Sequence, residues 1–189
     1  MAVNAANVIM GPATLYIAPF GAVEPTDLLV GTVPSSAVWT DLGGTDDGAV
    51  LTLGNEYADI TVDQIALAVG ARLNNQVVGL EVNLAEVTLQ NLKWAMNGGT
   101  IATSASVWQS YDPLSPDPAA FPNYAALLLD GPAPSSTVTK NRRVILRKIL
   151  NTEQVKSPYK KGDQMFFPVN FKGYYVSSST LPFHIVETP

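Results

Sequence analysis

Residues able to carry out catalysis are few in this chain, and they lack the neighbours that catalysis needs. His184 is the only histidine among 189 residues. It follows Leu181 near the end of the chain with no serine or carboxylate motif beside it. A base without a nucleophile or an orienting carboxylate forms no catalytic set, so we expect an ordinary surface or core residue. The chain has no cysteine, which excludes cysteine nucleophiles, thiolate metal sites and disulfide bonds.

Two acidic groupings have the composition, but not the spacing, of a metal site or a glycosidase site. Asp46-Asp47-Gly48 lacks the ligand spacing and distal glutamate of a calcium loop, so we interpret it as a turn. Asp59 with Asp63, or Asp63 with Glu81, forms a carboxylate pair without any further polar partner. Gly43-Gly44 precedes acidic residues that would repel a phosphate. The sequence therefore predicts no enzyme, no cofactor and no metal site.

The overall composition favours a protein that partners cover on several sides. Apolar residues make up 47% of the chain and charged residues 14%, which leaves a neutral surface. Residues 1–139 carry 13 acidic and 2 basic side chains, whereas residues 140–189 carry 9 basic and 3 acidic ones. Two explanations of this split stay open. In the first, the charges lie on solvated strand faces and their uneven distribution arose by chance. In the second, copies of the chain contact each other head to tail, with the acidic surface of one against the basic surface of the next.

The elements that position these residues are mostly strands. Alternating or apolar segments recur between Gly- and Pro-rich turns, at residues 13–18, 38–42, 50–53, 124–129, 144–150, 164–176 and 183–186. We expect one domain over residues 1–189, with residues 1–12 as an arm and the four-proline segment 112–122 as an exposed loop. Many strands and one helix predict a mainly β fold, an antiparallel β-sandwich or partial barrel flanked by one α-helix.

The longest alternating pattern lies within residues 56–84. Apolar residues alternate from Ile60 and again from Val78, and the alternation slips by one residue at Asp63–Gln64. A slip of this kind is typical of a β-bulge. We therefore predict a long bent hairpin with Gly70–Gln76 as its tip.

The amphipathic helix follows this hairpin directly. Asn83 with Glu86 three residues later has the form of a capping box, which predicts a helix that starts near Leu84. Gly98-Gly99 supplies the left-handed stop at its end.

Four motifs follow one another along the chain: W-x-x-L-G-x-T-x-x-G (39–48), V-D-Q (62–64), L-A-E-x-T-L-x-N-L (84–92) and F-P-V-x-F (167–171). In this order they resemble the motifs of the major tail proteins, or tail tube proteins, of long-tailed bacteriophages. The resemblance covers roughly residues 11–186. It implies the tail-tube fold, which is similar to that of type VI secretion tube proteins.

The resemblance also implies a structural function. Six-membered rings join their inner strands into one barrel and stack head to tail around the tape-measure protein, and genomic DNA later passes through the bore. Assembly is expected in the host bacterial cytoplasm and the final location in the virion tail, with tail terminator and distal tail proteins as further partners and no membrane contact. The alternatives are another phage structural β-protein, such as a tail terminator or head decoration protein, and a small β-sandwich binding module.

Two sets of residues become candidates for the tube. Polar side chains on the wet face of the predicted hairpin are candidates for the lumen wall, or simply face bulk solvent; they are Thr61, Asp63, Gln64, Glu81 and Asn83. An acidic lumen wall would repel DNA and let it slide. The basic strand near residue 145 is a candidate contact to a neighbour's acidic face, through Arg142, Arg143, Arg147 and Lys148.

Overall fold

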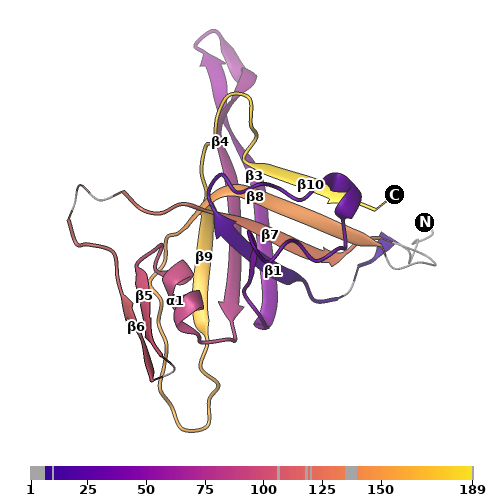
Figure 1. Cartoon of the computed structure of the whole chain (residues 1–189). Helices are drawn as coiled ribbons and strands as arrows, with labels where there is room; N and C mark the ends of the chain where they lie inside the picture. Colours follow the sequence, from indigo (N-terminus) through magenta and orange to yellow (C-terminus); the bar gives the residue numbers. More distant parts are fainter. Residues whose placement is uncertain are drawn as a thin grey trace.

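The computed structural model of this protein describes residues 7–9, 11–105, 107–117, 119, 121–134 and 140–188. Eight strands form one antiparallel sheet in the order β2-β1-β7-β8-β9-β4-β3, and β10 pairs with β8 as well (Figure 1). They are β1 (Thr14–Pro19), β2 (Thr40–Asp41), β3 (Thr45–Val62), β4 (Ile65–Leu84), β7 (Ala125–Pro132), β8 (Asn141–Asn151), β9 (Phe167–Gly173) and β10 (Phe183–Glu187). A separate hairpin is formed by β5 (Thr100–Ser104) and β6 (Trp108–Asp112).

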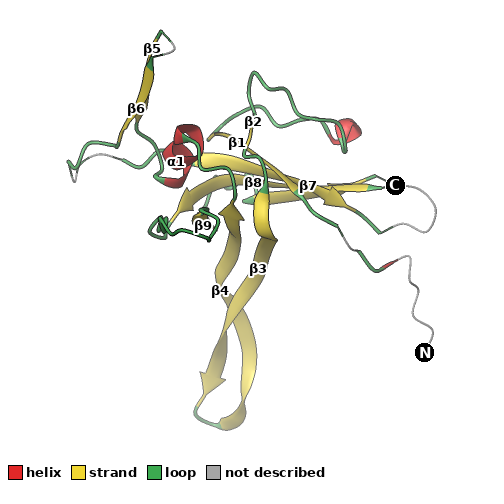
Figure 2. Ribbon diagram, turned by 90° about the horizontal axis from the view of Figure 1, so that it is seen from below, coloured by secondary structure: helices red, strands yellow, loops and turns green. Residues whose placement is uncertain are grey.

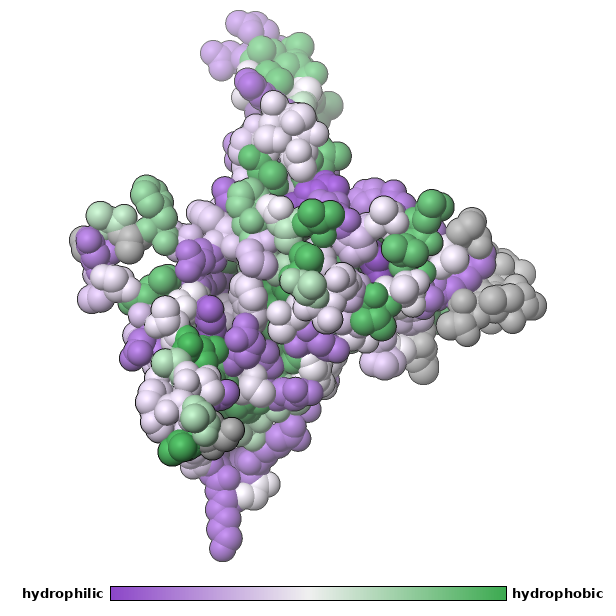
Figure 3. All heavy atoms as spheres, viewed as in Figure 1, coloured by the Kyte–Doolittle hydropathy of each residue, from purple (hydrophilic) through white to green (hydrophobic). Residues whose placement is uncertain are grey.

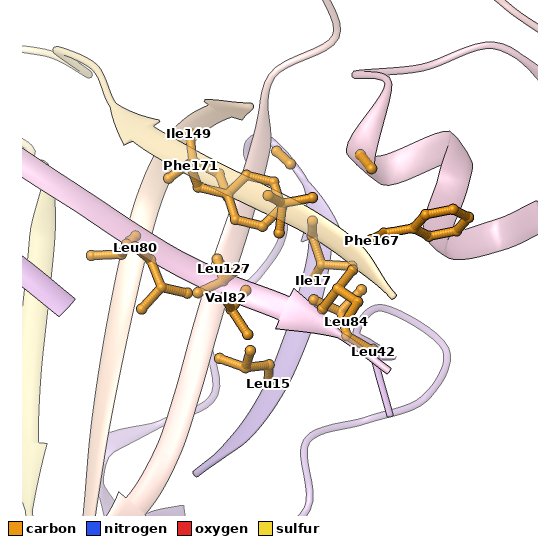
Figure 4. Close-up of a cluster of buried hydrophobic side chains, with 14 of the residues drawn as sticks. Leu15, Ile17, Leu42, Leu80, Val82, Leu84, Leu127, Ile149, Phe167 and Phe171 are labelled. Carbon is orange, nitrogen blue, oxygen red and sulfur yellow. The ribbon is translucent and has the colours of Figure 1, made fainter. Parts of the chain in front are cut away.

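The large sheet curls so that β4 and β9 pack over β1, β7 and β8. Alternation of apolar residues aims Val78, Leu80, Val82 and Leu84 of β4 at one side, where all four are buried. They meet apolar side chains of the other strands in one cluster (Figure 4), including Leu15, Ile17, Leu127, Leu146, Ile149, Phe167 and Phe171. Burying both layers against each other removes this apolar surface from water and stabilises the fold.

A second, smaller cluster covers the outer face of β1, β7 and β8. Tyr16, Leu128 and Ile145 point to this face and pack with Trp39. The Trp39 indole N–H donates to the carbonyl of Val23 at 3.1 Å, which fastens the segment between β1 and β2 over the sheet. This segment includes a short 3₁₀ turn, Asp27–Leu29.

The predicted start of the helix was wrong. The helix α1 runs over Leu89–Ala95, and the Thr88 hydroxyl accepts from the backbone N–H of Asn91 as its cap. Asn83 instead lies in β4, one residue before its end, and the Glu86 carboxylate accepts from the backbone N–H of Gly44 at 3.2 Å. The capping-box spacing therefore occurred where Asn83 is a strand residue and the Glu86 side chain holds a loop.

The predicted course of the central hairpin was also wrong. Its turn is Asp63-Gln64, where a bulge was expected, and residues 70–76 lie inside β4 instead of forming the tip. Asp46-Asp47-Gly48 is not a hairpin turn but an irregularity at the start of β3, where the register shifts between Asp46 and Ala49. Asp47 and Gly48 both have positive φ, 59° and 74°, a left-handed conformation that glycine adopts readily and aspartate tolerates.

Two projections leave the body of the protein on opposite sides. Figures 1 and 2 show the distal half of the β3–β4 hairpin on one side and the β5–β6 hairpin on the other. The predicted class, a mainly antiparallel β fold with one flanking α-helix, is confirmed for the described residues. Two predicted segments lie partly outside the described residues. They are the N-terminal segment 1–12, of which residues 1–6 and 10 are not described, and the Pro-rich loop, of which Pro118 and Ala120 are not described.

Candidate assembly surface

The distal part of the β3–β4 hairpin, residues 52–76, is exposed along its whole length, and we call it the arm. Its two strands pair only with each other among the described residues, because β9 reaches only Gly79–Leu84 of β4. β3 is the end strand of the sheet, so its outer edge carries no strand partner in the described chain. The arm is thus a two-stranded ribbon with two free edges and two wet faces.

The arm nevertheless carries large apolar side chains. Tyr57 and Leu73 lie opposite each other across the two strands, and both are more than half exposed. Further exposed apolar residues gather toward the turn: Ile60, Val62, Ile65, Leu67 and Val69. Figure 3 shows hydrophobic atoms at this tip of the molecule. Exposed apolar surface of this extent is typical of a contact with another chain.

Amides bridge the strands between the buried base of the arm and its apolar tip. The Gln76 side-chain amide donates to Asn55 Oδ1 at 3.3 Å, and the Asn75 amide donates to Glu56 Oε2 at 3.1 Å. Asn74 is the extra residue where the register shifts between Glu56 and Tyr57. These cross-strand pairs set the register where no core contact does.

The structure does not bring the five lumen candidates together. Thr61, Asp63 and Gln64 lie at the tip of the arm, whereas Glu81 and Asn83 lie at its base. Glu81 pairs opposite Val50, and alternation along β3 then sends the Thr61 side chain to the other face. The assignment of these residues to a lumen stays a prediction, but one common face for all five is wrong.

All four candidate cations on β8 already have partners within the same chain, and three of them lie near the surface. Arg147 pairs with Glu24 at 2.5 and 3.0 Å, and Arg142 pairs with Glu187. Lys148 lies over the rings of Phe20 and Tyr124. The acidic and basic halves of the sequence are therefore partly neutralised inside one copy, and the contact of this strand with a neighbour stays a prediction.

Arg143 is the most enclosed of these cations. Its side chain is 0% exposed and holds Asp130 through two bonds of 2.7 and 2.6 Å, while Nη2 also donates to the carbonyl of Thr32 at 2.8 Å. Nη1 has no partner among the described residues. Burial, followed by the carboxylates of Asp41 and Asp130, raises the pKa of the neighbouring Tyr16 hydroxyl, and Arg143 offsets part of this effect.

The residues considered for chemistry have ordinary structural surroundings. His184 Nε2 lies 3.2 Å from Asp27 Oδ1, which ties β10 to the segment over the outer face. Asp59 and Asp63 lie on the exposed arm, away from Glu81 at its base. Within the described residues, no group of three or more potential ligands forms a metal site.

The apolar residues of the arm are the functional candidates that sequence reasoning missed. Two apolar runs, ITV and IALAV, flank the two polar residues Asp63-Gln64. Two β-prone runs separated by two polar residues have the spacing of a two-residue hairpin, but Asp-Gln lacks the glycine or asparagine that marks such a turn, so the signal was weak.

A mainly β body with a ribbon that has free edges and apolar side chains defines a structural protein built to join other chains. Comparison with known families agrees, because a family model described as phage tail tube protein matches residues 1–183. The chain belongs to this family, which is a structural and non-enzymatic kind of protein of the multi-subunit virion tail. No curated protein matches the chain. No helix among the described residues is long and apolar enough to cross a membrane.

Proposed function

We propose that this chain is the repeating subunit of a tail tube, in which six copies form a ring and rings stack into a channel. The observation that carries the proposal is the arm, whose two faces and two edges are open in a single copy. An isolated two-stranded ribbon is marginally stable in water, and a long open edge is a template for another strand. Neighbouring copies would supply the missing strands.

The two open edges favour a ring over a symmetric dimer. One edge belongs to β3 and the other to residues 65–77 of β4, and they lie on opposite sides of the ribbon. Pairing β3 of one copy with β4 of the next is a head-to-tail contact, and repeated rotation closes it. Closure would join the arms into a continuous inner barrel and leave no open edge. The ring size of six rests on the resemblance to tube proteins.

The bore of such a ring would be lined by the face of β4 that turns away from the core. Glu81 and Asn83 lie on this face, because Leu80, Val82 and Leu84 alternate with them toward the core. A carboxylate in the wall repels DNA phosphates and prevents adhesion. Thr61, Asp63 and Gln64 remain candidates for the wall at the level of the tip.

The remaining partners follow from this role. During assembly in the host bacterial cytoplasm the bore would hold the tape-measure protein, and during infection it would deliver DNA to the host. Tail terminator and distal tail proteins would close the two ends of the tube.

Negative-stain electron microscopy of the purified protein tests the proposal. Tubes with a central channel support it. Isolated rings would favour a tail terminator instead, and stable monomers at high concentration would favour a binding module; either result would overturn it.

Tyr57→Asp combined with Leu73→Asp places two charges on the arm and should abolish tubes. The matched control is Leu28→Asp, on a residue 95% exposed outside the arm, which should leave tubes intact.

A second experiment tests the role of the bore. Glu81→Lys should still give tubes but should slow DNA ejection by virions that carry it, because a cation in the wall attracts phosphates. Asp117→Lys, in the exposed Pro-rich loop, is the matched charge control. Unchanged ejection with Glu81→Lys would exclude an electrostatic function of this position.

A further inference from the structure

The tip of the arm combines apolar and acidic side chains. Leu67 is 79% exposed, and Val62 and Ile65 beside the turn are exposed as well. Asp59 and Asp63 are the charged residues between positions 59 and 71, so the tip is an apolar knob with negative charge. A knob of this kind fits a hollow that offers apolar walls and a cation.

The same chain contains such a hollow at the base of the arm. A groove of about 680 Å³ lies between residues 73–78 of β4 and the segment that follows β9. Figure 1 shows this segment rising beside the arm before it turns into β10. The groove offers Leu73, Val77, Tyr174 and Tyr175 as apolar walls and Lys172 as its cation. Glu56 also borders it, with its carboxylate held by the Asn75 amide.

The tip cannot reach the groove of its own chain. Thr52 of β3 lies opposite Gly79, which pairs with Lys172. Asp63 lies eleven residues beyond Thr52 along the arm, which at strand geometry is about 36 Å. Because the arm projects away from the body, its tip is available only to another molecule (Figure 2).

We propose that the tip of each arm docks into the groove at the base of the arm of a copy in the next ring. This inference rests on the proposed function and names the partner of the tip. Within one ring the arms lie side by side, so each tip lies beside the tips of its neighbours. The groove lies at the other end of the arm, so a tip can reach only the groove of a copy in the adjacent ring. Leu67 and Ile65 then pack on Tyr175 and Val77, and Asp63 pairs with Lys172. The rise from ring to ring is then at most the length of the arm beyond Thr52, about 36 Å, because strands of a closed barrel tilt from its axis.

Site-directed cross-linking tests this contact cleanly, because the chain contains no cysteine. Preformed tubes of the double variant Asp63→Cys, Lys172→Cys are treated with a short bifunctional thiol reagent and run on a denaturing gel. Each copy should be joined to the next ring, which gives a ladder of covalent oligomers. Asp63→Cys alone can join neighbouring tips only within one ring, so its products, like those of Lys172→Cys alone and of the pair Asp63→Cys, Leu28→Cys, should not extend beyond the size of one ring.

The failures of the two proposals are distinguishable. Tubes that show no ladder with the Asp63–Lys172 cysteine pair would overturn the docking contact and leave the tube function standing. Absence of tubes from the wild-type protein would overturn the tube function itself. A ladder from Asp63→Cys alone that extends beyond the size of one ring would place tips of adjacent rings against each other and would also overturn the docking contact.

Charge and apolar variants give an independent readout. Asp63→Lys or Lys172→Asp alone should raise the protein concentration at which tubes form, and the combined swap should restore it. Leu67→Asp should raise that concentration by about tenfold or more, the effect of exposing one buried leucine side chain, whereas Leu28→Asp should not change it. A swap that fails to restore assembly, or a Leu67→Asp variant that assembles normally, would contradict the contact.

Discussion

Removing the carboxylate beside Arg143 should destabilise the folded monomer severely. In Asp130→Ala, the fully buried guanidinium loses both bonds of its bidentate partner and retains only the carbonyl of Thr32. An uncompensated charge in an apolar interior costs about 3–5 kcal/mol of unfolding free energy when its partner is removed. The same strand carries a matched control in Arg142, whose partner Glu187 is 40% exposed. Glu187→Ala should cost at most about 1 kcal/mol, because water screens an exposed pair.

Urea unfolding of the monomer, below the concentration at which copies associate, measures both losses. Replacing both partners, as in Asp130→Leu with Arg143→Met, should recover much of the stability, since neither charge then remains buried. A loss with Asp130→Ala no larger than that with Glu187→Ala would refute the reasoning. A normally stable Asp130→Ala monomer that no longer forms tubes would instead show that Arg143 acts between copies, as the sequence suggested.

Three further predictions concern the body of the protein. Phe171→Ala, at the centre of the core, should lower the unfolding free energy by about 3–5 kcal/mol, whereas Phe121→Ala on the surface should change it by less than about 0.5 kcal/mol in the same urea titration. Thr88→Ala should cost about 1 kcal/mol through loss of the helix cap, and Asn83→Ala should leave the far-ultraviolet signal of the helix unchanged. The unfolding free energy should fall as the pH rises through the raised pKa of Tyr16, because the unfolded chain then ionises first; Tyr16→Phe should reduce that fall in alkaline titrations.

The sequence predicted the strands that bury one face and failed where no face is buried within one chain. Val78 to Leu84 alternate because β4 packs there on the core, and the alternation located that strand correctly. Along the arm both faces are wet, so the spacing of apolar residues reports no internal core. Gly70 and the asparagines 74 and 75 have the composition of a turn, but they form ladder positions and a bulge. The actual turn, Asp63-Gln64, contains neither glycine nor asparagine.

The ion pairs were beyond prediction for a different reason. Arg147 and Glu24 are 123 residues apart in sequence, and Arg143 reaches the carbonyl of Thr32 across 111 residues. No local pattern announces such contacts, because the curl of the sheet creates them. The split of charge between the two halves of the chain suggested contacts between copies. The fold instead places part of the basic half against part of the acidic half of the same copy.

The two parts of β4 are therefore stabilised in different ways. The base of β4 is fixed by the core, so the direction of the arm is set in the single copy, whereas residues 65–76 stay exposed until another chain covers them. Contacts at the arm thus stabilise an assembly without first stabilising the monomer, and the apolar area that stays exposed in one copy is available for association. An open row of paired copies keeps one unpaired strand edge at each of its two ends, and only closure of the ring removes both. A subunit built in this way favours complete rings over partial ones, because every incomplete ring retains an exposed strand edge.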